Sequence, residues 1–123
     1  LRVPGVNEGY SSKLSIHEAI KAQLYVLGYR LKYLPVLESR CGTKRIDCVY
    51  LQGNNPVCAI EVDYSIRKNS LAKLNSMPAS TEKILISYGG SMVWYRSKAR
   101  NKKLLGDVAL FRLCGHQNFQ SIR

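Results

Sequence analysis

Three strand-like runs follow one another between two helix-like segments, and this order constrains the fold more than any other feature of the chain. The runs cover residues 30–39, 44–51 and 57–63 and are rich in β-branched, aromatic and other apolar residues. The turn sequences RCGT and QGNNP separate them. The pattern therefore predicts three consecutive strands in a meander.

The two flanking segments carry apolar residues at helical spacing. Before the strands, Ser15 and Glu18 form a capping box, and Gly28 predicts the end of the helix. The stripe between them consists of Ile16, Ala19, Ile20, Leu24 and Leu27. After the strands, a second stripe ends before Pro78 and consists of Ile66, Leu71, Leu74 and Met77.

The remaining sequence predicts two further strands and one weaker element. KILISY is typical of a strand, and GGS predicts a turn into MVWYR as its hairpin partner. DVALFRL is the weaker element near the end. The predicted order is α, β, β, β, α, β, β, with no internal repeat.

The length of 123 residues suits one compact domain. Residues 1–14 lack any period and contain Pro4 with turn-forming Gly and Asn, so we expect a leader or linker before a single domain over 15–123. No apolar run approaches the roughly 18 residues of a membrane span, and no signal peptide is visible. We expect a cytoplasmic protein without a membrane partner, and Leu1 in place of Met is typical of a domain cut from a longer chain.

Charge points to a polyanionic partner. Nineteen Lys and Arg against eight Asp and Glu give a net charge of +11. Such a surplus attracts phosphate backbones or an anionic membrane surface, although it can also serve solubility alone. Because no segment has the pattern of a basic amphipathic helix, nucleic acid is the favoured partner.

The four cysteines do not indicate a zinc site, because they show neither CxxC spacing nor a neighbouring pair of His. Cys48 and Cys58 lie within apolar strand patterns and are expected to be buried. A disulfide between Cys41 and Cys114 stays open as an alternative, but reduced thiols are favoured.

Acidic residues interrupt two neighbouring strands. Glu61 and Asp63 share one face of the third strand because side chains alternate. Asp47 lies about as far before the QGNNP turn as Glu61 lies after it, so antiparallel pairing places the two side by side. Carboxylates this close repel unless a cation or a shared proton lies between them. Salt bridges to nearby Lys or Arg are the alternative explanation for each acid.

Carboxylate oxygens are the ligands that Mg²⁺ or Mn²⁺ prefers, and a cation so held can activate water and stabilise charge on a phosphate. In a basic protein this chemistry predicts hydrolysis of phosphodiester bonds. Glu38 is expected to be an exposed charge at a strand end, and His17 and His116 have no evident partner.

The helix with Glu18, the RID sequence with Asp47 and the strand ending IEVD, followed by a helix, together resemble the PD-(D/E)xK nuclease superfamily. The resemblance covers about residues 15–88. It implies a restriction-endonuclease-like αβββαβ core, an α/β fold with a mixed central sheet flanked by helices. It also implies that Asp47, Glu61 and the backbone carbonyl of Val62 hold Mg²⁺ or Mn²⁺, with Glu18 as a further ligand. Many relatives dimerise, so a homodimer is an open expectation.

One position departs from this family. Asp63 stands where the superfamily usually has Lys, which positions or deprotonates the attacking water. Some members with an acid there use it as a ligand or base, and others take the cation from the next helix. Arg67, Lys68 and Lys73 are the candidates for that cation, although Lys73 is expected on the exposed side of its helix.

A basic stretch after Trp94 and Tyr95 is the main candidate for contacts to nucleic acid, with a solvated loop as the alternative. Its five cations are Arg96, Lys98, Arg100, Lys102 and Lys103. Lys44 and Arg45, before Asp47, and Arg67 and Lys68, after Asp63, would extend the basic surface.

The leading hypothesis is therefore a metal-dependent endonuclease that hydrolyses DNA, with Asp47, Glu61, Asp63 and Lys73 as the catalytic residues. A catalytically inactive nucleic-acid-binding module on the same fold is the first alternative. An RNA-cleaving or toxin nuclease domain is the second.

Overall fold

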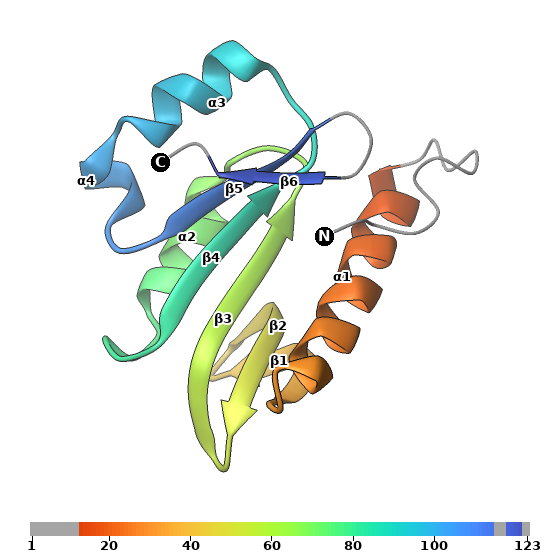
Figure 1. Ribbon diagram of the computed structural model, residues 1–123. Helices are drawn as coiled ribbons and strands as arrows, with labels where there is room; N and C mark the ends of the chain where they lie inside the picture. Colours follow the sequence, from red (N-terminus) through yellow and green to blue (C-terminus); the bar gives the residue numbers. More distant parts are fainter. Residues whose placement is uncertain (1–12, 115–117, 122–123) are drawn as a thin grey trace.

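The computed structural model describes residues 13–114 and 118–121 as a single six-stranded sheet with helices on both faces (Figure 1). The strands are β1 (Leu34–Cys41), β2 (Lys44–Gln52), β3 (Asn55–Asp63), β4 (Glu82–Ser87), β5 (Ala109–Cys114) and β6 (Asn118–Ser121). The helices are α1 (Lys13–Arg30), α2 (Lys68–Asn75), α3 (Met92–Ala99) and α4 (Lys102–Leu105). The prediction of an α/β fold with a mixed, helix-flanked sheet is confirmed, and the first six elements follow in the predicted order.

The strands lie side by side in the order of the sequence. The meander β1–β2–β3 is antiparallel, β4 runs parallel to β3, β5 runs parallel to β4, and β6 returns antiparallel. Parallel neighbours need a crossover connection, which α2 provides between β3 and β4. The carboxyl ends of β3 and β4 therefore lie at the same edge of the sheet (Figure 1).

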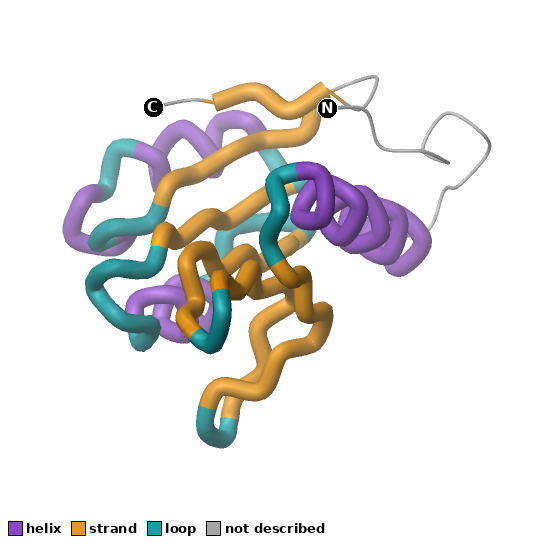
Figure 2. Tube along the Cα trace, turned by 60° about the horizontal axis from the view of Figure 1, so that its bottom comes forward, coloured by secondary structure: helices purple, strands orange, loops and turns teal. Residues whose placement is uncertain are grey.

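Two apolar cores lie on opposite faces of the sheet, and the two views agree that α1 covers one face while α2, α3 and α4 cover the other (Figures 1 and 2). The α1 core includes Ile20 and Leu24 with the strand residues Cys48, Ile60 and Val62. The α2 core includes Ala59, Leu71, Leu74 and Leu85, together with Tyr95 of α3 and Leu105 of α4. Alternation along β3 thus divides its residues between two buried faces.

Helix α1 is longer than the sequence pattern indicates. It begins at Lys13, inside the predicted leader, so Ser15 lies in its first turn rather than at its cap. It also continues past Gly28 to Arg30. A Cβ at Gly28 would lie 2.7 Å from the Tyr50 ring, so this glycine permits close packing of helix on sheet and does not end the helix. Residues 1–12 of the predicted leader lie outside the described residues.

The prediction of a strand over MVWYR is wrong, because these residues begin α3. Strands β4 and β5 are parallel, with Ile84 opposite Ala109, so the chain has to cross the face of the sheet between them and cannot form a hairpin. The Oγ of Ser91 accepts a hydrogen bond from the Val93 N–H and caps the helix. The DVALFRL element is confirmed as β5.

Cys41, Cys48 and Cys58 are free thiols. Cys48 is buried as predicted, and Cys58 is half-buried. The alternative of a Cys41–Cys114 disulfide is therefore wrong; these residues lie in β1 and β5, with three strands between them. The side chain of Cys114 and the whole of His116 lie outside the described residues.

Leu74 fixes α2 on the sheet, and its neighbour Lys73 reaches the site described below. The Leu74 side chain is fully buried. We expect Leu74→Ala to lower the free energy of unfolding by about 2 to 5 kcal/mol, measured by urea denaturation, because the substitution leaves a cavity. Leu34→Ala is the matched control, since Leu34 is 51% exposed and its truncation should change stability by about 0.5 kcal/mol or less. Equal effects of the two substitutions would contradict this account.

No helix in the ranges 13–114 and 118–121 is both long enough and apolar enough to cross a membrane.

Candidate active site

The site lies where β2 and β3 separate. Backbone pairing between these strands extends to Cys48 opposite Ile60. Beyond this pair the side chains replace the backbone ladder: the Asp47 N–H donates to Glu61 Oε2 at 2.8 Å, and the Val62 N–H donates to Asp47 Oδ2 at 2.7 Å. These reciprocal bonds hold both carboxylates in fixed positions, as the spacing from the turn predicts for the pair.

Glu61 is the most deeply buried acid of the site, with only 1% of its surface exposed. The Lys73 ammonium from α2 forms an ion pair with Glu61 Oε1 and also donates to the Arg45 carbonyl at 3.0 Å. Burial, helped by the neighbouring Asp47 charge, raises the pKa of Glu61 to about 7 against the opposing effect of Lys73. The site therefore holds a carboxyl group that exchanges its proton near neutral pH.

Lys73 lies on the inner side of α2 toward Glu61, half-buried, and the prediction that it is an exposed helix residue is wrong. The four-carbon stem of Lys lets the ammonium reach past the apolar stripe of the helix. Burial lowers the pKa of Lys73, but the hydrogen bond and charge of Glu61 outweigh burial and raise it. Lys73 is therefore an ammonium at neutral pH.

Asp47 faces α1, where its partner is His17. The His17 Nε2 lies 3.5 Å from Asp47 Oδ2. Burial works to raise the pKa of Asp47, but the hydrogen bonds from His17 and the Val62 N–H outweigh it and hold that pKa below its ordinary value. The same hydrogen bond raises the pKa of His17. Asp47 is thus the ionised member of the carboxyl pair.

Asp63 is directed away from this pair toward α2. The Ser70 Oγ donates to Asp63 Oδ2, and the Asp63 carbonyl accepts from the Tyr88 N–H at 3.0 Å. Burial raises the pKa of Asp63, and Asp47 adds to the effect. The contacts of Asp63 are those of a residue that joins the β3 end to α2 and β4.

Glu18 is not brought to the pair by any contact among the described residues. Its side chain is 59% exposed and lies 3.7 Å from His17 Nδ1 and 3.5 Å from the Lys21 ammonium. His17, one position earlier, occupies the side of α1 that faces Asp47.

His17 was not among the site residues predicted from the sequence. A helix brings residues four apart to one side, so His17 and Lys21 face the sheet together. Lys21 is buried and pairs with Glu38, whose backbone has a φ of +52°. Glu38 lies in β1 between Leu37, which pairs with Cys48, and Ser39, which pairs with Ile46. The Lys21–Glu38 pair fixes α1 against β1. The helical spacing of His17 and Lys21 was the available signal, but their partners lie on strands that only the tertiary structure brings near.

The donors for a cation are few. Asp47 and Glu61 are adjacent, and the Val62 backbone lies beside them. Within residues 13–114 and 118–121, no group of three or more His, Cys, Asp or Glu side chains is arranged to hold a metal ion. Of the three acids Asp47, Glu61 and Asp63, only the first two therefore lie together as a pair of possible ligands.

The predicted basic residues lie in three groups along the chain. Lys44 and Arg45 begin β2, Arg67 and Lys68 begin α2, and all four are exposed. Arg96, Arg100, Lys102 and Lys103 are exposed along α3 and α4. Lys98 differs from them, because its ammonium donates to the Ile66 carbonyl at 2.7 Å.

Comparisons with models of known protein families, with curated proteins and with solved structures find no match.

Proposed function

We propose that this chain is a metal-dependent endonuclease that hydrolyses DNA phosphodiester bonds, built on the restriction-endonuclease-like fold of the PD-(D/E)xK superfamily. The carrying observation is the buried Glu61 carboxyl, placed between the Asp47 peptide and the Lys73 ammonium where β2 and β3 separate. The order α1–β1–β2–β3–α2–β4, with β4 parallel to β3, supports the proposal.

The donor set suits a hard divalent cation. Asp47 is ionised, and Glu61 loses its proton near pH 7, so the pair carries the negative charge that such a cation neutralises. Asp47, Glu61 and the Val62 carbonyl would hold Mg²⁺ or Mn²⁺ with water in the remaining positions. When bound, the cation would supply stabilisation of phosphate charge and a more acidic water.

Lys73 supplies the positive side-chain charge that the superfamily usually takes from a Lys at the position of Asp63. Because its ammonium stays protonated beside Glu61, Lys73 acts as a hydrogen-bond donor that orients the attacking water and stabilises charge developing on the phosphate. His17 holds the Asp47 carboxylate from the opposite face of the sheet. The residues of both helices thus fix the two acids before substrate binds.

An inactive nucleic-acid-binding module is the second candidate, and one observation favours it. Both Glu61 oxygens are engaged within the protein, by Lys73 and by the Asp47 N–H. In such a module these bonds would only close the sheet between β2 and β3. Binding of DNA without uptake of Mg²⁺ would distinguish this candidate.

Cleavage by a Lys73→Met variant tests the proposal. We expect wild-type protein to nick supercoiled DNA in Mg²⁺ or Mn²⁺ but not in EDTA, and Lys73→Met to be about a hundredfold slower, since it lacks one preorganised charge. Met keeps the apolar stem of Lys and removes only the charge of the side chain. Nicking rates on plasmid DNA give the measurement.

Lys32→Met is the charge-matched control. Lys32 is exposed just after α1 and is expected to leave the rate unchanged. The proposal fails if folded wild-type protein cuts no DNA in either metal, or if Lys73→Met cuts as fast as Lys32→Met. A parallel assay on RNA separates a ribonuclease from a deoxyribonuclease.

A further inference from the structure

Trp94 is the most exposed aromatic side chain on the α3 surface. It lies in the first turn of α3 with 68% of its surface exposed, next to Val93 at 78%. The next residue, Tyr95, is only 3% exposed, so the helix packs on the protein through that side. A large indole held out in water on a fixed helix is available to a partner.

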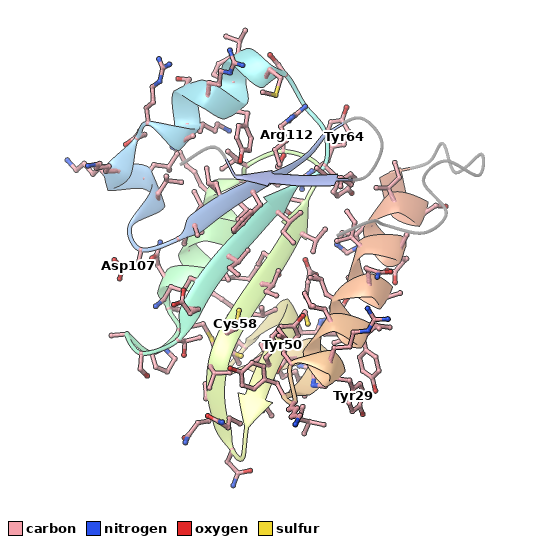
Figure 3. The ribbon with its side chains drawn as sticks, viewed as in Figure 1. Tyr29, Tyr50, Cys58, Tyr64, Asp107 and Arg112 are labelled. Atoms are coloured by element: carbon pink, nitrogen blue, oxygen red, sulfur yellow. The ribbon has the colours of Figure 1, made fainter. Side chains whose placement is uncertain are left out.

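The position of Trp94 is fixed relative to the end of β3. The Lys98 ammonium ties α3 to the Ile66 carbonyl, three residues after Asp63. The Arg112 guanidinium donates to the carbonyls of Gly89 and Gly90 at 2.6 and 3.0 Å and lies 5.5 Å from the centre of the Tyr95 ring. Figure 3 labels Arg112 of β5 and Tyr64, the residue after β3, near the top of the view. These contacts keep α3 beside the segment that follows β3.

Trp94 borders the chain segment that leaves the site. The lining of a small hollow includes Ser65 and Ile66 from the β3–α2 connection, Gly89 and Gly90 after β4, and Trp94 of α3. Asp63 immediately precedes this connection. A ligand on the Trp94 ring would therefore lie beside the end of β3.

Positive charge continues from Trp94 along the surface. The exposed cations are Arg96, Arg100, Lys102 and Lys103, and no described carboxylate forms an ion pair with them. The sequence has no Asp or Glu from Lys83 to Gly106. Trp94 and Arg100 are about 9 Å apart along the helix axis.

We propose that α3 and α4 bind a nucleic-acid strand with an unpaired base stacked on Trp94, so that the substrate has single-stranded or unstacked nucleotides beside the cut. This inference rests on the proposed function, which makes the partner a nucleic acid. It adds that the bound part of the nucleic acid is single-stranded or unstacked. The faces of paired bases are covered by their neighbours in a duplex, whereas an unpaired base exposes a face to an aromatic ring. The cations beyond Trp94 bind the phosphates of the same strand.

An anionic membrane is the other class of partner that Trp and basic residues can bind. Membrane binding by a helix uses a broad apolar face. In α3 the apolar residues Met92, Tyr95 and Ala99 are buried or half-buried against the protein, which leaves Val93 and Trp94 exposed. The observations favour nucleic acid.

Fluorescence tests the proposal, since Trp94 is the single Trp of the 123 residues. The chain is titrated in EDTA with a twelve-nucleotide thymidine oligomer and, separately, with a duplex of equal length, so no cleavage interferes. We expect the oligomer to quench Trp94 emission and to bind at least about fivefold more tightly than the duplex. Anisotropy of labelled oligomer measures affinity.

Variants separate stacking from charge. Trp94→Ala should lose the preference for the oligomer, Trp94→Phe should keep most of it, and Val93→Ala is the matched control that should keep it fully. Arg100→Gln should weaken binding of both nucleic acids and reduce the salt slope by about 1. Circular dichroism verifies that each variant is folded.

Three outcomes would overturn the inference: emission unchanged at saturation, equal affinities of Trp94→Ala and wild type for the oligomer, or an emission shift only with vesicles containing phosphatidylserine. Because binding is measured without metal, a chain that stacks the oligomer but cuts nothing refutes the proposed nuclease activity alone. If Trp94→Ala cuts DNA as fast as wild type and binds the oligomer equally tightly, the stacking role alone is refuted.

Discussion

Asp47→Asn is expected to lower Mg²⁺-dependent cleavage of DNA by about a thousandfold or more, because it removes the ionised carboxylate that would bind the cation. The Asn oxygen can still accept the hydrogen bond from the Val62 N–H, so the separation of β2 and β3 is retained. The loss would then reflect charge and not misfolding. Single-turnover nicking rates over a range of Mg²⁺ concentrations measure it.

Glu82→Gln provides the control for this loss of a carboxylate. Glu82 is an exposed acid at the first residue of β4, opposite Cys58 and away from the end of β3 that carries the site. We expect this variant to cleave at the wild-type rate. The assignment of Asp47 is refuted if folded Asp47→Asn retains the wild-type rate and metal dependence.

Stability of the wild-type protein is expected to fall as pH rises from about 4.5 to about 7, owing to Glu61. The pKa of this carboxyl is raised in the folded state, so the folded state binds the proton more tightly than the unfolded state does. The stabilising contribution of the protonated Glu61 carboxyl is complete at pH values below its pKa in the unfolded state. It is lost as the pH rises through its pKa in the folded state. The loss amounts to about 3 kcal/mol, measured as the free energy of unfolding in urea across this pH range.

Glu61→Gln should remove this component, because Gln is neutral at every pH. Asp63 and His17 also have raised pKa values and contribute with the same sign, so the decisive quantity is the difference between wild type and the variant. Glu82→Gln should retain the wild-type slope. Parallel slopes for wild type and Glu61→Gln would show that Glu61 is not buried as a neutral acid.

Mg²⁺ should restore the lost stability above pH 7 if the pair binds it. A ligand present at a hundred times its dissociation constant stabilises the folded state by about 2.7 kcal/mol. The gain should be present at pH 8, small at pH 5.5 where Glu61 holds its proton, and absent in Glu61→Gln. A metal-independent unfolding temperature at pH 8 would favour the inactive module.

Much of the fold could be predicted from local patterns. Period-two runs with turn residues between them identify β1, β2 and β3, and an apolar stripe identifies α2, because burial on one face requires these periods. The segment Met92–Ala99 could not be identified in this way. Its Val, Trp and Tyr favour a strand locally, and the parallel pairing of β4 with β5, which requires a crossover, is a long-range property.

The sequence by itself determined the carboxyl pair, since the distance of Asp47 and Glu61 from one tight turn sets their register. Only the tertiary structure decided which cation and which imidazole serve that pair. Lys73 and His17 come from helices on opposite faces of the sheet, and their reach depends on how α1 and α2 pack. Helix packing is set by side chains distant in the sequence, so no local spacing encodes these two contacts.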